Sequence, residues 1–277
     1  MAQVALPKSP KIQIPPNCLG GQFKGKVALV TGGGAGIGRA TALAFAKEMA
    51  NVVVSDILAK GGEETVRIIR EAGGKSVFIK ADLYQESETE ALILKVIERY
   101  GRIDFAFNNT CIGQPLPLTA DHDKETWDSI ICTNSVWLCM KYEILQMLKQ
   151  GVGTIVNKLS DAELVFVPPM STYTTTEHGI LGLTKTAALK YARAGIRVNA
   201  IYPGPIATKK NKACISTHPK LQVNLKRFRT PEKFAAAVVW LCSDAASDIT
   251  GIALPIDMDR QHDSKWDSSE KYFMKRR

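Results

Sequence analysis

The feature that most constrains the fold is the segment Lys26–Ala40, KVALVTGGGAGIGRA, in which a short apolar run leads into a glycine-rich turn. Val27–Val30 has the length and β-branched content of a strand that is buried on both faces. Apolar residues at helical spacing follow the glycines. A strand, a tight turn and a helix bring free backbone N–H groups and the positive end of a helix dipole together, which binds phosphate. The segment therefore predicts a phosphate-binding turn, with a plain strand–helix loop as the alternative.

A carboxylate follows at the spacing that a dinucleotide-binding fold requires. Asp56 ends a second apolar run, Val52–Val54, about twenty residues after the turn, where such folds place the carboxylate that binds the adenine-side ribose. A carboxylate there repels a 2′-phosphate, and neither Ala35 nor Ile57 supplies a cation to bind one. The pattern therefore predicts NAD(H) rather than NADP(H) as the cofactor.

The glycine spacing Thr31-Gly32-x-x-x-Gly36-x-Gly38 differs from the commoner G-x-G-x-x-G. It resembles the signature of the short-chain dehydrogenase/reductase family, and the resemblance continues over residues 23–257. For Asp82 it implies contact with the adenine, whereas chemistry alone equally favours a turn or a helix N-cap. The cofactor-binding residues that the resemblance implies are Gly32, Gly34, Gly36, Ile37, Gly38, Asp56, Asp82, Leu83, Asn109, Pro203, Gly204, Ile206 and Thr208.

The same resemblance implies a set of catalytic residues. In the family a serine precedes a tyrosine by thirteen residues, and Ser160 and Tyr173 have this spacing. Tyr173 is then expected to exchange a proton with the substrate oxygen, while Ser160 donates a hydrogen bond to it. Asn134 matches the position whose backbone helps to hold a proton-relay water, the alternative being an ordinary polar residue within a helix.

The fourth catalytic position differs from the family pattern. A lysine usually follows the tyrosine by four residues, but this chain has Glu177 there, on the same helical face as Tyr173. A neighbouring negative charge disfavours a tyrosinate, so Glu177 is expected to accept hydrogen bonds from ribose hydroxyls without activating Tyr173. Lys158 shares strand parity with Ser160, so it is either a displaced ammonium partner of Glu177 or a lysine that extends to the surface.

Further departures surround the same region, at Thr110, Cys111, Glu163 and Met258. Two functions therefore stay open. The first is an NAD-dependent oxidoreductase, with a degenerate catalytic tetrad, that transfers a hydride between NAD(H) and a carbonyl/alcohol substrate. The second is a redox-silent relative that binds a ligand or partner, or catalyses a non-redox proton transfer in the same pocket.

Strands that alternate with helices predict an α/β fold, a doubly wound parallel sheet of about seven strands in one Rossmann-type domain. This domain is expected over residues 23–260, with a helix over 124–149 and a basic substrate-covering lid at 209–230. The proline-rich residues 1–22 are predicted to form an extension, and residues 261–277 a charged tail.

Composition excludes several other classes of function. The net charge of +9 comes from basic residues spread along the chain, which argues against nucleic-acid binding and favours a small anionic or polar substrate. The sequence has neither a membrane-length apolar run nor a secretory signal, and its six cysteines lack metal-ligand spacing. We therefore expect a cytoplasmic protein without metal or membrane partners. The resemblance also implies a homodimer or homotetramer.

Overall fold

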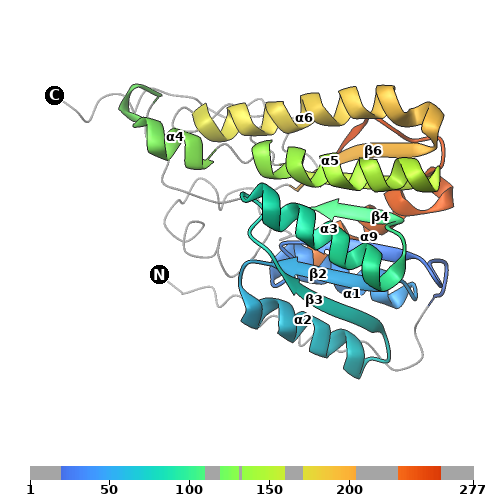
Figure 1. Ribbon diagram of the computed structural model, residues 1–277. Helices are drawn as coiled ribbons and strands as arrows, with labels where there is room; N and C mark the ends of the chain where they lie inside the picture. Colours follow the sequence, from blue (N-terminus) through green and yellow to red (C-terminus); the bar gives the residue numbers. More distant parts are fainter. Residues whose placement is uncertain (1–19, 110–118, 131–132, 160–170, 204–229, 257–277) are drawn as a thin grey trace, which may run out of the picture.

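The computed structural model describes residues 20–109, 119–130, 133–159, 171–203 and 230–256. Its strands form one seven-stranded sheet in the order β3-β2-β1-β4-β5-β6-β7, and every pairing is parallel (Figure 1). The strands are β1 (Val27–Thr31), β2 (Asn51–Asp56), β3 (Lys75–Lys80), β4 (Phe105–Asn108), β5 (Gly153–Lys158), β6 (Ile196–Pro203) and β7 (Ala253–Ile256). The predicted doubly wound sheet in a single domain is confirmed.

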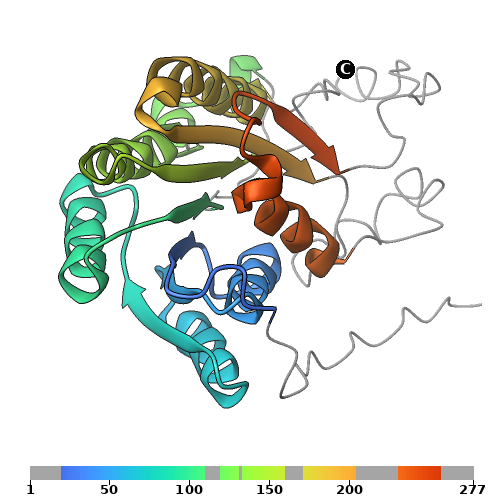
Figure 2. The same ribbon diagram turned by 90° about the vertical axis from the view of Figure 1, so that its right-hand side faces the viewer.

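Helices cover both faces of the sheet, as a parallel sheet requires. One face is covered by α1, α2 and α9 and the other by α3, α5 and α6 (Figure 2). The bounds are α1 (Gly36–Lys47), α2 (Ala59–Glu71), α3 (Glu86–Tyr100), α4 (Lys124–Ile130), α5 (Thr133–Gln150), α6 (Ser171–Tyr191) and α9 (Pro231–Cys242). The strand order reverses between β1 and β4, and ligands of such folds bind at the carboxyl edge beside that reversal.

The helix expected over residues 124–149 is described in two parts, α4 and α5. Residues 131–132 between them lie outside the described part, so the continuity of this helix stays a prediction.

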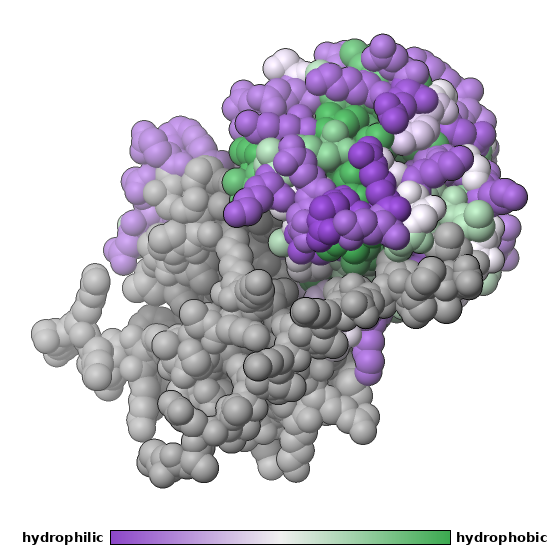
Figure 3. All heavy atoms as spheres, turned by 90° about the horizontal axis from the view of Figure 1, so that it is seen from below, coloured by the Kyte–Doolittle hydropathy of each residue, from purple (hydrophilic) through white to green (hydrophobic). Residues whose placement is uncertain are grey.

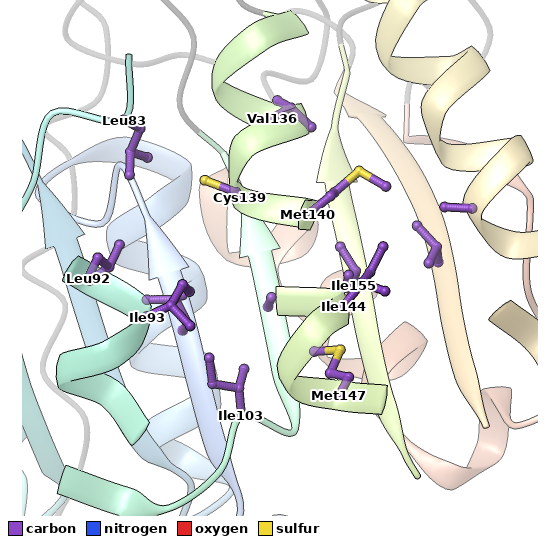
Figure 4. Close-up of a cluster of buried hydrophobic side chains, with 14 of the residues drawn as sticks. Leu83, Leu92, Ile93, Ile103, Val136, Cys139, Met140, Ile144, Met147 and Ile155 are labelled. Atoms are coloured by element: carbon purple, nitrogen blue, oxygen red, sulfur yellow. The ribbon is translucent and has the colours of Figure 1, made fainter. Parts of the chain in front are cut away.

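A hydrophobic cluster on each face fixes the strands. On one face, α3 and α5 pack their apolar side chains over the sheet, with Ile93 and Ile144 among the residues labelled in Figure 4. On the other face, the Phe105 ring lies 4.5 Å from that of Phe23 and 5.8 Å from that of Phe45, between centroids. These clusters hold the carboxyl ends of β1, β2, β4 and β5 in fixed positions, from which the candidate site residues extend.

Candidate functional site

The glycine-rich turn joins β1 to α1 at the carboxyl edge of the sheet and is held from β4. The backbone N–H of Asn109 donates to Thr31 Oγ1 (3.0 Å), and its side-chain Nδ2 donates to the carbonyl oxygens of Thr31 (3.2 Å) and Gly32 (3.1 Å). Thr31 Oγ1 in turn donates to the carbonyl oxygen of Phe107 (3.3 Å). Asn109 therefore fixes the path of the turn.

Glycine is required within this turn for steric reasons. A Cβ added at Gly38 would lie 2.1 Å from the carbonyl oxygen of Gly32 and 2.8 Å from Asn109 Nδ2. Gly32 and Gly36 have φ of 58° and 51°, in the left-handed region that favours glycine. Ala35, the N-cap residue of α1, has no side chain that could accept hydrogen bonds from the start of the helix. Among the described residues, no side-chain cap occupies the first N–H groups of α1, so an anion can bind them. The turn therefore fits a pyrophosphate.

Asp56 is joined to the turn by its carboxylate. Oδ2 accepts a hydrogen bond from the backbone N–H of Gly34 (2.9 Å), and Oδ1 accepts one from the N–H of Leu58 (2.9 Å). The half-buried carboxylate lines a cleft of about 840 Å³ together with Gly34 and Ala35. Each carboxylate oxygen retains acceptor capacity beyond its backbone bond, so Asp56 is held in an orientation that suits a ligand hydroxyl.

Sequence reasoning missed Arg39, which lines the same cleft. Its Nε donates to Thr65 Oγ1 (2.9 Å), and Nη2 donates to the carbonyl oxygens of Gly34 and Gly61, the latter at 3.2 Å. Arg39 thus fastens the turn to the start of α2. The sequence signal for this residue is its basic side chain one position after the glycine motif.

Lys60 and Arg67 also line the cleft, and they belong to the outer face of α2. Seen from the side of α2, the described surface is mostly hydrophilic (Figure 3). Arg67 forms ion pairs with Glu64 and Glu71 on its own helix, and these hydrogen bonds raise its pKa. The rim of the cleft therefore carries charges of both signs.

Asp82 forms a turn after β3. Its Oδ1 accepts a hydrogen bond from the backbone N–H of Tyr84 (3.1 Å), and its own N–H donates to Glu88 Oε2 (2.8 Å). The turn alternative is therefore present in the structure, while an adenine contact stays a prediction. The side chain of Leu83 is buried in the cluster beneath α3 and α5.

The structure describes only some of the predicted catalytic residues. Asn134 is the second described residue of α5, and its side chain is exposed. Tyr173 and Glu177 lie on α6, and Glu177 is only 2% exposed. Four predicted site residues lie outside the described part, namely Ser160, Gly204, Ile206 and Thr208. The side chain of Tyr173 is not described either. Pro203 is the last residue of β6.

The departures from the family pattern fall largely in the same gaps. Thr110, Cys111, Glu163 and Met258 lie outside the described residues, and Lys158 is half-buried at the end of β5. The pairing of Lys158 with Glu177 therefore stays a prediction.

The described thiols are unsuited to nucleophilic chemistry. Cys139 and Cys242 are buried, and burial raises the pKa of Cys242 to about 12 and that of Cys139 well above its ordinary value. Among the described residues, no group of three or more His, Cys, Asp or Glu side chains is placed to hold a metal ion. A membrane-spanning helix is likewise absent from this part of the chain.

Comparison with known proteins decides the family. Residues 32–258 match a family model described as Enoyl-(Acyl carrier protein) reductase. The chain is 39% identical over 246 residues to the Short chain dehydrogenase/reductase astE of Aspergillus oryzae, which covers 85% of this chain and 94% of that protein. This chain belongs to the short-chain dehydrogenase/reductase family. Membership makes it part of an oxidoreductase family and implies an NAD(P) cofactor.

Other members of the family are similarly close. A 2,5-dichloro-2,5-cyclohexadiene-1,4-diol dehydrogenase from Sphingobium indicum is also 39% identical over 246 residues, covering 85% of this chain and 96% of that protein. The crystal structure of levodione reductase superimposes with a TM-score of 0.82 at 33% identity, covering 86% of this chain and 98% of that one. The similarity therefore extends over nearly the whole length of these short-chain dehydrogenases.

Proposed function

We propose that this short-chain dehydrogenase/reductase transfers a hydride between NAD(H) and a small carbonyl/alcohol substrate. The observation that carries the proposal is the Asp56 carboxylate, which is hydrogen-bonded to Gly34 of the turn and faces the cleft. Preorganised acceptors bind a ribose hydroxyl without a further cost of ordering. Two relatives, a diol dehydrogenase and a levodione reductase, support the substrate class.

The choice of NAD over NADP follows from the charges around the cleft. The negative charge of Asp56 opposes a 2′-phosphate at the ribose that it binds. Arg39 directs its Nε and Nη2 donors to Thr65, Gly34 and Gly61, so much of its guanidinium is committed to the protein. Lys60 remains on the rim as a competing cation. We propose that Asp56 decides the preference for NAD over NADP, because its carboxylate contacts the turn directly.

The catalytic roles rest on the family pattern. When bound, NAD(H) supplies or accepts the hydride at the substrate carbon. Tyr173 then donates a proton to the carbonyl oxygen during reduction, or accepts the hydroxyl proton during oxidation, while Ser160 donates a hydrogen bond to that oxygen. Asn134 helps to hold the relay water, and Glu177, in place of the usual lysine, accepts hydrogen bonds from ribose hydroxyls.

A second function, a redox-silent ligand-binding or proton-transferring protein, is favoured by the buried carboxyl group of Glu177. This side chain is 2% exposed and lies one helical turn after Tyr173 on α6. A carboxylate there cannot stabilise a tyrosinate as an ammonium would. The two functions therefore differ in whether hydride transfer survives the substitution.

Titration with NADH and NADPH, followed by nicotinamide fluorescence, separates the two functions. The oxidoreductase predicts saturable binding of NADH that is tighter than that of NADPH, and oxidation of simple alcohols with NAD that Tyr173→Phe abolishes. Absence of NADH binding at millimolar concentration would instead support the redox-silent protein. Equal or tighter NADPH binding would contradict the role of Asp56.

We further propose a homodimer or homotetramer that uses α5 and α6. These helices expose large apolar side chains in the single chain, namely Trp137, Leu145, Leu148 and Leu189. Burying apolar surface between subunits stabilises an assembly by about 25 cal/mol per Å². Their positions on the outer sides of the helices that carry Asn134 and Tyr173 support this face.

A further inference from the structure

A buried polar cluster lies beneath the candidate site, on the face of the sheet that α5 and α6 cover. It consists of Asn108 on β4, Glu143 on α5, Asn157 on β5 and Thr184 on α6, each at most 2% exposed. Asn108 and Asn157 are register partners across β4 and β5. The same face of α5 carries apolar residues of the hydrophobic core, including Met140 and Ile144 (Figure 4), and Asn157 Nδ2 lies 3.2 Å from Met140 Sδ.

The hydrogen bonds of the cluster fix the orientation of each amide. Thr184 donates its hydroxyl proton to the carbonyl oxygen of Ile180 (2.8 Å), so its oxygen accepts from Asn157 Nδ2 (3.0 Å). Asn157 Oδ1 therefore points to Asn108 and accepts from Asn108 Nδ2 (3.1 Å). The second N–H of the same Nδ2 donates to Glu143 Oε2 (3.0 Å).

One additional proton would satisfy two further buried oxygens of this arrangement. Within the described chain, Asn108 Oδ1 and Glu143 Oε1 have no hydrogen-bond partner, and both are acceptors when Glu143 is ionised. They belong to the two side chains already joined by the bond from Nδ2 to Oε2. A proton on Oε1 would give the pair a donor for Oδ1, and an unsatisfied buried acceptor costs free energy.

We propose that Glu143 is a neutral carboxylic acid that pairs with the Asn108 amide through two hydrogen bonds, and that it positions the site. The elements that the cluster joins are those that lead to the candidate site residues. Asn109 follows Asn108 directly, and Asn134 and Tyr173 lie on the same helices as Glu143 and Thr184. Glu143 acts through these neighbours and is a positioning residue. The inference does not depend on the proposed function.

The surroundings of Glu143 favour its protonated form. Burial raises its pKa to about 7, although the hydrogen bond from Asn108 opposes this in part. Cys139, one turn earlier on α5, is also buried and un-ionised at neutral pH, since its pKa is raised. On the packed elements, the buried or half-buried ionisable side chains that the structure describes are Lys158 of β5, Glu177 and Tyr191 of α6, and Arg197 and Tyr202 of β6. The buried face of α3 contributes only Thr89, Leu92, Ile93 and Val96.

The test compares wild type with Glu143→Gln, which retains both hydrogen bonds as a neutral amide at every pH. Because the folded pKa of about 7 exceeds the ordinary value of 4.5, the native state alone holds this proton between those values. The stabilisation that this native-state proton gives the fold is fully present below pH 4.5 and is lost as pH rises to 7. The wild-type folding constant should therefore fall about 300-fold relative to Glu143→Gln over this range.

Thermal melting from pH 4.5 to 9 measures this difference, with the exposed Glu90→Gln of α3 as the control that should follow wild type. At pH 6, the difference infrared spectrum of wild type minus Glu143→Gln should show the band of a protonated carboxyl, whereas that of wild type minus Glu90→Gln should not. Hydrogen exchange at residues 105–109 should stay slow in Glu143→Gln and become faster in Glu143→Ala.

Two results would overturn the proposal. One is a melting difference between wild type and Glu143→Gln that does not change with pH. The other is an infrared spectrum at pH 6 that is the same in wild type and Glu143→Gln, which would mean an ionised carboxylate. Both measurements use variants that retain the side-chain volume, so a folding failure of Glu143→Ala would leave the test intact.

Discussion

Replacing Asp56 with alanine tests the central contact of the candidate site. The change removes both carboxylate oxygens, so the N–H groups of Gly34 and Leu58 lose their acceptors. Gly34 is buried, whereas Leu58 is 70% exposed and its N–H regains a partner from water. The loss of stability therefore comes mainly from the Gly34 bond.

The magnitude follows from that one bond. A hydrogen bond to a charged group contributes about 1.5–3 kcal/mol to stability. For a chain of this size, we expect Asp56→Ala to lower the melting temperature by about 3–10 °C. If Asp56 also binds a ribose hydroxyl, NADH affinity should fall about 10- to 100-fold, since each 1.4 kcal/mol is a factor of ten. NADPH should lose less affinity, because its 2′-phosphate no longer meets a negative charge.

The assay is differential scanning fluorimetry together with fluorescence titration of NADH and NADPH. Asp82→Ala is the matched control, because Asp82 follows the neighbouring strand β3 and accepts its backbone bond from Tyr84. An adenine contact at Asp82 would affect both cofactors alike, since they share that ring. If Asp56→Ala weakened NADH and NADPH by the same factor, or left melting unchanged, the reasoning about the ribose site would be refuted.

Three further predictions concern the rest of the site. Glu177→Lys should raise alcohol turnover at pH 7 about tenfold or more by favouring the ionised form of Tyr173, as steady-state kinetics would show; unchanged kinetics would place residue 177 away from Tyr173. Gly38→Ala should cost about 1–3 kcal/mol by chemical denaturation, whereas Gly182→Ala on the exposed side of α6, where a Cβ meets nothing within 4 Å, should not destabilise. Trp137→Glu should convert the proposed oligomer to smaller species in light scattering, and an unchanged mass would exclude that face.

The sheet and the glycine turn could be predicted because their signals are local. Each buried strand is a short apolar run, and the turn needs glycine at positions where a Cβ would meet backbone, as at Gly38. Asp56 was found at the end of β2 because strand ends in a parallel sheet share one edge. These inferences need only spacing along the chain.

The contacts of Arg39 and Glu143 could not be predicted, because each depends on elements that meet only in the folded chain. Arg39 donates to Thr65 and Gly61 of α2. The backbone of Gly61 also lies so close to Gly34 that a Cβ at position 34 would contact it too tightly. Glu143 of α5 faces the end of β4, which lies far from it along the chain. Periodicity marks both positions as helical and gives no partner for either.

Two carboxyl groups, Asp56 and Glu143, show why the type of residue at position 177 does not by itself settle the function. Asp56 accepts two backbone N–H bonds and faces a cleft. Glu143 accepts one amide N–H in a buried apolar setting, and burial raises its pKa. Burial and the number of donors, as well as the residue type, therefore act on a carboxyl group. Only an ionised Glu177 would oppose a tyrosinate at Tyr173, whereas a neutral one would leave the tyrosine without its usual cation but without repulsion. The gain expected from Glu177→Lys is therefore larger if Glu177 is ionised, and its pH dependence reports which form is present.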